Sequence, residues 1–397
     1  MRIIFLTFLF FLISGFLPLL SYSNNDKDSL ETKLSKVNDF EKIKILNKLA
    51  EKYLTIAPDK SIYFAKIALK TQRRAASYKY KSLSFNLIGD AYKAEGNNIE
   101  ALNFYQKAQY AANKYGTKED VASSLNNIGV IYRLFTDYNR SIEYHKQALD
   151  LFAENNYYKG IAQTYNYSGI VYRNLNQAKL AKEYYNLAYQ LSITHNLKEE
   201  EALSLLNLGN IYWYDENYSE ALLNYEKALK IFNELNNYSE ISGVLNNIGN
   251  VKRELGNYKE AMEYLRKSFI IAEKYYDRNQ LAVTLRNIGK TFQKQKNLDS
   301  ALYYFRLSLN FSLDNDLRRY IQDNYQSIAE IQEISGQKNE AINNLKLYIE
   351  TREKNLKDEK SQSVLNLQYK FELDKKENEL KNLNLYKNKV LLYIVLI

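Results

Sequence analysis

Polar side chains that could hold a peptide recur at 40-residue intervals along this 397-residue chain. Side-chain amides can hydrogen-bond the backbone of an extended peptide, and guanidinium groups hold carboxylates through two parallel hydrogen bonds. The candidates form three rows: Asn127, Asn207, Asn247 and Asn287; then Asn210, Asn250 and Lys290; then Lys93, Arg133, Arg173, Trp213 and Arg253. These residue types point to peptide binding. The alternative is that the asparagines pack helix against helix and the arginines form an ordinary solvated surface.

Groups suited to catalysis or metal binding are scarce. The chain has no cysteine, which excludes disulfides, thiolate nucleophiles, iron–sulfur clusters and Cys-ligated zinc. His145 and His195 are the only histidines, so a multi-histidine metal centre is excluded. His145 takes the place that Tyr105 and Tyr185 hold in the repeat described next, and we expect it to be packed. His195 falls in a turn between repeats, where we expect it to be solvated. We therefore expect no cofactor, no metal and no enzymatic activity in these residues.

The glycines show how the polar rows are positioned. Six of the 13 glycines follow one another at steps of 40, in a series that Ala329 continues, and three more each come seven residues after a member of that series. The first series is Gly89, Gly129, Gly169, Gly209, Gly249 and Gly289, and the others are Gly96, Gly256 and Gly336. A fixed spacing of this kind indicates an internal repeat.

Each repeat is predicted to contain two helices. The repeat around Gly209 has Tyr212 one turn later, then Ala221, Tyr225 and Ala228 at helical spacing. Small residues at fixed points let two helix backbones approach closely, and the large rings beside them fill the remaining space. Gly256 is expected in the turn between the helices, because glycine readily adopts the positive φ that ends a helix.

The order Leu208-Gly209, Tyr212, Ala221, Tyr225 and Ala228 resembles the tetratricopeptide repeat. This resemblance implies an all-α fold, a right-handed α-solenoid of antiparallel helix pairs, whose first helices line a concave groove that the three polar rows would face. The sequence departs from the family in two ways. The period is 40 rather than about 34 residues, which we assign to a longer second helix and turn, and the family's proline is absent.

The solenoid is expected to cover residues 43–361 in about eight 40-residue units, after a lead-in at 24–42. The first unit, 43–81, is diverged, and Pro58 lies in its inter-helix turn. After the repeats, residues 362–389 are rich in Lys, Glu, Asn and Leu, and we expect a coiled-coil-like helix there, which offers a homodimer contact.

The two ends of the sequence suggest export and a membrane anchor. Residues 1–23 combine Arg2, an apolar stretch and Ser21-Tyr22-Ser23, which predicts a signal peptide cleaved before Asn24; an uncleaved anchor is the alternative. Residues 390–397 are all apolar but too few for a bilayer, which needs about 20. We interpret them as the start of a transmembrane helix within which the sequence is truncated, the alternative being a short hydrophobic tail.

Signal peptide, repeats, Lys/Glu-rich helix and span together resemble bacterial membrane-bound signal transducers. The resemblance implies repeats in the periplasm, anchored in the inner membrane, with a histidine kinase or helix-turn-helix module following. We expect a protein or peptide partner, anionic ones included. The net charge of +9 does not indicate nucleic acid, because export argues against it and a Lys-rich composition accounts for the charge. The alternative function is a non-switching envelope scaffold.

Overall fold

The computed structural model describes residues 37–54, 57–72, 79–356 and 385–386. The signal peptide predicted at 1–23, nearly all of the coiled-coil-like helix predicted at 362–389, and the span predicted from 390 lie outside these ranges. Within them, no helix has the length and the hydropathy that crossing a bilayer requires.

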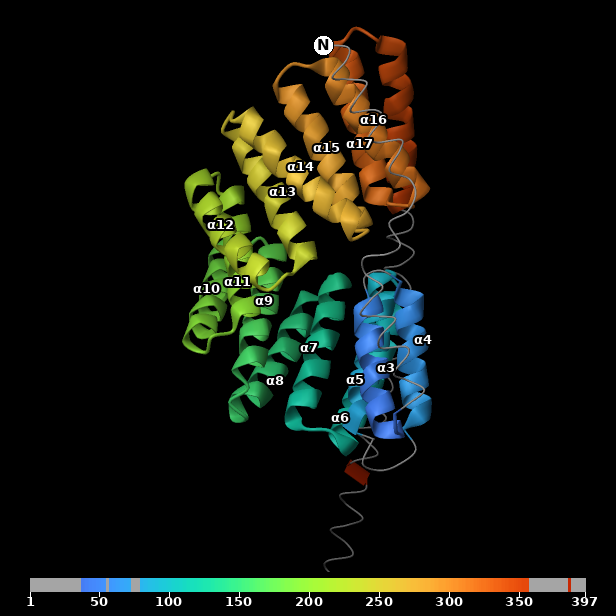
Figure 1. Ribbon diagram of the computed structural model, residues 1–397, viewed down its shortest axis with the longest axis vertical. Helices are drawn as coiled ribbons and strands as arrows, with labels where there is room; N and C mark the ends of the chain where they lie inside the picture. Colours follow the sequence, from blue (N-terminus) through green and yellow to red (C-terminus); the bar gives the residue numbers. More distant parts are fainter. Residues whose placement is uncertain (1–36, 55–56, 73–78, 357–384, 387–397) are drawn as a thin grey trace, which may run out of the picture. The chain divides into compact units, whose positions relative to one another are not determined.

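The described chain is an all-α solenoid, as the repeat predicted, with no strand among the described residues. It divides into two compact units, residues 1–304 and 305–397. Consecutive helices of the first unit pack as antiparallel pairs (Figure 1). Its first helices are α3 (Asp39–Tyr53), α5 (Lys81–Ala94), α7 (Lys118–Leu134), α9 (Tyr158–Asn174), α11 (Lys198–Tyr214), α13 (Tyr238–Glu254) and α15 (Arg278–Lys294). Its second helices are α4 (Pro58–Thr71), α6 (Asn98–Tyr115), α8 (Tyr138–Glu154), α10 (Ala178–Thr194), α12 (Tyr218–Glu234) and α14 (Tyr258–Lys274).

Helix α16 (Leu298–Asp314) contains the boundary between the units. The second unit continues with α17 (Arg318–Ile334) and a helix over 338–356. Pro58 begins α4, where its missing N–H has no intrahelical partner to lose.

The helices end at residues with positive φ, spaced by 20 along most of the array. Gly256 has φ of 78°, which confirms the predicted turn, and non-glycine residues such as Asn176 and Lys296 take φ of 58° and 61° at equivalent places. A full 40-residue repeat consists of two 17-residue helices, such as α9 and α10, each followed by a three-residue connection such as 175–177. The two helices of a unit are thus equally long, so the 40-residue period is two equal halves.

The periodic glycines are close-contact points between the two helices of a unit, as predicted. A Cβ at Gly169 would lie 2.5 Å from the ring of Tyr185, and one at Gly209 would lie 2.6 Å from the ring of Tyr225. Gly129 stands in the same relation to His145, at 2.8 Å. Each ring therefore occupies the space that the missing side chain leaves, 16 residues further along the chain.

Candidate peptide-binding groove

A groove of about 780 Å³ lies where α9, α10, α11, α12 and α13 meet. Five of the twelve predicted binding residues line it: Arg173, Asn210, Trp213, Asn247 and Asn250. The remaining lining residues are Asn174, Asn176, Ala178, Ile211, Tyr214, Asp215 and Tyr225. The groove thus combines amides, one arginine and aromatic rings, a set of groups that suits a peptide backbone with its side chains.

Three of the other predicted asparagines hold neighbouring first helices together. Each donates from its Nδ2 to the Oδ1 of an asparagine in the preceding repeat. The pairs are Asn127 with Asn86 at 3.3 Å, Asn207 with Asn166 at 3.4 Å, and Asn287 with Asn246 at 2.6 Å. These three asparagines therefore pack helix against helix, which is the alternative that the sequence left open.

The acceptors of those bonds belong to a further row, which the sequence-based prediction missed. Four asparagines of this row, the three acceptors and Asn126, donate to a serine or threonine hydroxyl in the next repeat, and we call the resulting series the asparagine ladder. Its bonds are Asn86 to Ser124 at 3.3 Å, Asn126 to Thr164 at 2.7 Å, Asn166 to Ser204 at 3.0 Å, and Asn246 to Thr284 at 2.7 Å. The signal was present in the sequence as asparagine three residues before the periodic glycine, together with Ser or Thr two residues earlier.

Asn210, Asn247 and Asn250 reach the groove itself. Asn210 Oδ1 accepts from the Tyr225 hydroxyl at 2.8 Å and from Asn247 Nδ2 at 3.3 Å. Asn250 Oδ1 accepts from an Nη atom of Arg253 at 2.8 Å. Within the described part of the chain, the Nδ2 of Asn210 donates no hydrogen bond, so it is available to a ligand carbonyl.

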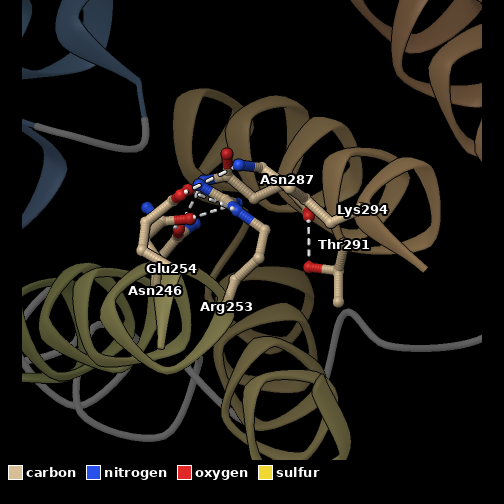
Figure 2. A network of polar contacts seen from close by, with 7 residues as sticks. Asn246, Arg253, Glu254, Asn287, Thr291 and Lys294 are labelled. Carbon is tan, nitrogen blue, oxygen red and sulfur yellow. Dashed lines mark hydrogen bonds and ion pairs between the residues drawn. The ribbon is translucent and has the colours of Figure 1, made fainter. Parts of the chain in front are cut away.

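The predicted cations differ in whether an acidic group already holds them. Lys93 pairs with Asp90 at 2.9 Å. Arg253 is only 6% exposed and pairs with Glu254 at 3.1 Å, and Glu254 also holds Lys294 at 3.2 Å (Figure 2). Lys290 lies half-buried on α15. Arg253 therefore belongs to an internal polar network that includes Asn250 and the ladder residue Asn246.

Arg133 and Arg173 have no acidic partner within 4.0 Å among the residues that the structure describes. They occupy equivalent positions in the last turns of α7 and α9. Burial, and then the like charge of Arg173, lowers the pKa of Arg133. Two neighbouring guanidinium groups of this kind attract an anion.

Three buried donors near these arginines have no acceptor in the described part of the chain: Arg133 Nε, Trp213 Nε1 and the hydroxyl of Tyr185. Tyr185 is fully buried, and burial raises its pKa to about 12, so the hydroxyl keeps its proton at neutral pH. Buried donors are almost always satisfied in folded proteins. A bound group with acceptor oxygens would satisfy donors of this kind.

The two histidines each contact a neighbouring side chain. His145 is 1% exposed, as expected, and its Nδ1 lies 2.9 Å from Asn126 Oδ1. Burial, with a smaller effect from Arg133, lowers its pKa to about 3. His195 lies in the connection after α10, as expected, but it is only partly exposed to solvent, with its ring stacked 3.5 Å from that of Tyr158 at the start of α9. No cluster of three or more metal-ligating side chains occurs among the described residues.

Solved structures similar to this chain share its fold. A Rap protein complexed with Competence and Sporulation Factor has a TM-score of 0.56 at 15% identity, over 84% of this chain and 97% of its own. The Rap conjugation gene regulator of plasmid pLS20, in complex with the Phr* peptide, has a TM-score of 0.54 at 16% identity, over 82% and 93%. A signal transduction ATPase with a tetratricopeptide repeat sensor from Pyrococcus horikoshii has a TM-score of 0.57 at 15% identity, over 84% of this chain and 54% of its own.

Sequence comparison gives the family directly. No curated protein matches the chain. The tetratricopeptide repeat model matches residues 81–154, 160–234 and 240–314, which is more than half of the sequence and includes the helices that form the groove. With the glycine–ring contacts and the paired helices, these matches establish that the chain belongs to the tetratricopeptide repeat family.

Proposed function

We propose that this chain binds a peptide, or a peptide segment of a protein, in the groove formed by α9 to α13. The observation that carries the proposal is the lining of that groove by Arg173, Asn210, Trp213, Asn247 and Asn250. Asn210 offers an amide donor to a peptide carbonyl, while Trp213 and Tyr214 offer ring surface to apolar side chains.

An acidic group on the peptide would fit the neighbouring cations. Arg133 and Arg173 supply positive charge, and neither has an acidic partner within 4.0 Å in the described part of the chain. The Nε of Arg133, the indole N–H of Trp213 and the hydroxyl of Tyr185 are donors without an acceptor among the described residues. Because charge-assisted hydrogen bonds are the stronger ones, a carboxylate at this place would contribute most of the specificity.

Two structural neighbours support a peptide-type ligand, since one is complexed with Competence and Sporulation Factor and the other with the Phr* peptide. A third is described as containing a tetratricopeptide repeat sensor, which supports a sensory role. We therefore propose that the bound partner is a signal rather than a substrate.

The binding experiment can use Trp213, because it is the only tryptophan in the chain and it lines the groove. Intrinsic fluorescence would be titrated with pools of random decapeptides, one pool rich in Asp and Glu and one rich in Lys. The acidic pool should shift the emission, and raising the salt concentration should weaken the effect.

The variant Arg133→Ala/Arg173→Ala should weaken binding of the acidic pool about tenfold or more. The control Lys227→Ala/Lys230→Ala removes the same charge from exposed positions on α12 and should bind as the wild type does. Absence of any fluorescence change with either pool, or an equal loss in both variants, would refute the proposal.

We further propose that the repeats lie outside the inner membrane, as part of an anchored signal transducer. This rests on the signal-peptide pattern of residues 1–23 and on the apolar run 390–397. Alkaline phosphatase fused after residue 356 should be active in a bacterial host and should lose activity when residues 1–23 are deleted. Activity that does not depend on residues 1–23, or none at all, would contradict export. The DNA beyond codon 397 is a second test, since a kinase or helix-turn-helix module should follow there.

A further inference from the structure

The asparagine ladder is interrupted between α11 and α13. Leu206 stands at the position of the donating asparagine, and Val244 stands at the position of the accepting hydroxyl. We call the contact between two neighbouring first helices a joint. At the preceding joint, between α9 and α11, Asn166 donates to Ser204 at 3.0 Å, and at the following joint, between α13 and α15, Asn246 donates to Thr284 at 2.7 Å. Leu206 and Val244 cannot form this bond, because neither side chain has a polar atom.

The backbones also differ at this joint. From α3 to α15, all other pairs of neighbouring first helices pack directly against one another, whereas α11 and α13 approach each other less closely. Among the described residues, the side-chain hydrogen bond that links the two helices is from Asn247 Nδ2 to Asn210 Oδ1, at 3.3 Å. One long amide–amide bond therefore stands where neighbouring joints have direct helix contact and a ladder bond.

Apolar contacts hold both sides of the joint, since Leu205 of α11 is buried in one cluster with Val244 and Leu245 of α13. Helix α12 packs against α13, with Phe232 fully buried in the same cluster as Ile241, Val244 and Leu245. Apolar contacts are non-directional, whereas hydrogen bonds weaken steeply when their geometry changes. A small rotation of one repeat against the next is thus tolerated by these apolar contacts, and fewer side-chain hydrogen bonds oppose it than at the neighbouring joints.

The groove lies at this joint, with Asn210 on α11 and Asn247 and Asn250 on α13. We propose that the joint between α11 and α13 is a hinge at which the first unit opens and closes, so that the groove can adjust its width to a ligand. Leu206 and Val244 are the residues that create the hinge, because they remove the ladder bond where the groove is formed.

The hinge can be measured without any ligand, so the result is independent of the proposed peptide binding. The chain has no cysteine, and spin labels can be attached at chosen positions. The pair Lys227→Cys/Lys267→Cys spans the α11–α13 joint. The control pair Leu187→Cys/Lys227→Cys occupies the same repeat positions and spans the α9–α11 joint, where the ladder bond is present. All three residues are exposed on second helices, and Leu187 is 49% exposed.

Double electron–electron resonance should give a distance distribution about twice as broad for the 227–267 pair as for the 187–227 pair, because hinge motions are collective and large. Distributions of equal width would overturn the proposal. This comparison uses the unaltered joint and does not depend on a variant that alters the core.

Exchanging the ladder residues of the α9–α11 and α11–α13 joints tests whether the missing ladder bond causes the motion. Leu206→Asn/Val244→Thr restores the ladder pair, and the new hydroxyl can donate to the carbonyl four residues earlier, as Thr164 does to Gly160 at 2.7 Å. This variant should narrow the 227–267 distribution to the width of the control pair. The reciprocal variant Asn166→Leu/Ser204→Val should broaden the 187–227 distribution. If both distributions keep their wild-type widths, the ladder does not control the motion and the assignment to Leu206 and Val244 fails.

Discussion

The single residues that decide packing in this protein are the glycines opposite a buried ring. Gly169 and Gly243 both lie inside first helices, on α9 and α13. A side chain at Gly169 would meet Tyr185 at 2.5 Å, whereas one at Gly243 would meet only the flexible Gln280 side chain at 3.9 Å. The role of a glycine therefore depends on what its missing side chain would touch.

Gly169→Ala should lower the free energy of unfolding by about 1–3 kcal/mol, because the methyl group overpacks the contact with Tyr185. Gly243→Ala should raise it by about 0.5–1 kcal/mol, because alanine is the better helix former and the space is open. Urea titration of both variants measures the difference, and equal effects would contradict the assigned contacts.

His145 makes stability depend on pH. Its pKa is about 3 in the folded chain and about 6.5 in the unfolded one, because burial disfavours the charged ring. The contribution is complete above pH 6.5 and is lost as the pH falls toward 3, which amounts to about 3 kcal/mol by pH 4.

The matched variant is His145→Tyr, since tyrosine fills the same slot in the repeats of Tyr105, Tyr185 and Tyr225. Between pH 7 and pH 4, wild type should lose more free energy of unfolding than the variant, by the amount assigned to the histidine. Urea titrations at both pH values measure this, and parallel losses would show that His145 is not the group responsible.

At the scale of helices, the positive φ at the helix ends sets the 20-residue half-repeat. Glycine supplies it at no steric cost, whereas a residue such as Lys296, with φ of 61°, is strained there. The connections after α13 and α15 have the same conformation with different residues, so their exchange is a direct test.

Gly256→Ala should destabilise the protein by about 1 kcal/mol, since φ is 78° and no atom lies within 4 Å to cause a clash. Lys296→Gly should stabilise it by about 0.5 kcal/mol, the relief of strain exceeding the added entropy of the unfolded chain. Thermal unfolding followed by circular dichroism reports both signs, and opposite signs would mean that the turns are not limited by backbone conformation.

At the scale of the whole molecule, the 40-residue repeats follow one another, and from α3 to α15 all neighbouring first helices except α11 and α13 pack directly. Stability in such arrays is approximately a sum over repeats and interfaces. Removing one whole period should therefore preserve the register of every remaining contact, while removing half a period should not.

Deletion of residues 158–197, which removes α9, α10 and their connections, should leave a cooperatively folding protein with the same helicity per residue. Its urea m-value should fall by about one-eighth, in proportion to the surface buried. Deletion of 178–197 removes only α10, places two first helices in succession, and should abolish cooperative unfolding. Cooperative unfolding of both deletions would contradict the pairing of helices into units.

The sequence by itself determined the repeat and its internal contacts. Gly209 and Tyr225 meet in the structure because their spacing places one on each helix of a pair, which is local information repeated many times. The cation and asparagine rows were also visible, but whether each member is available to a ligand was not. Asn287 is held by Asn246 of the preceding repeat, whereas Arg173 lines the groove, and that difference depends on which side chains lie across the joint. Only the tertiary structure decided this, because partners about 40 residues apart meet through the packing angle between repeats, which no local pattern specifies.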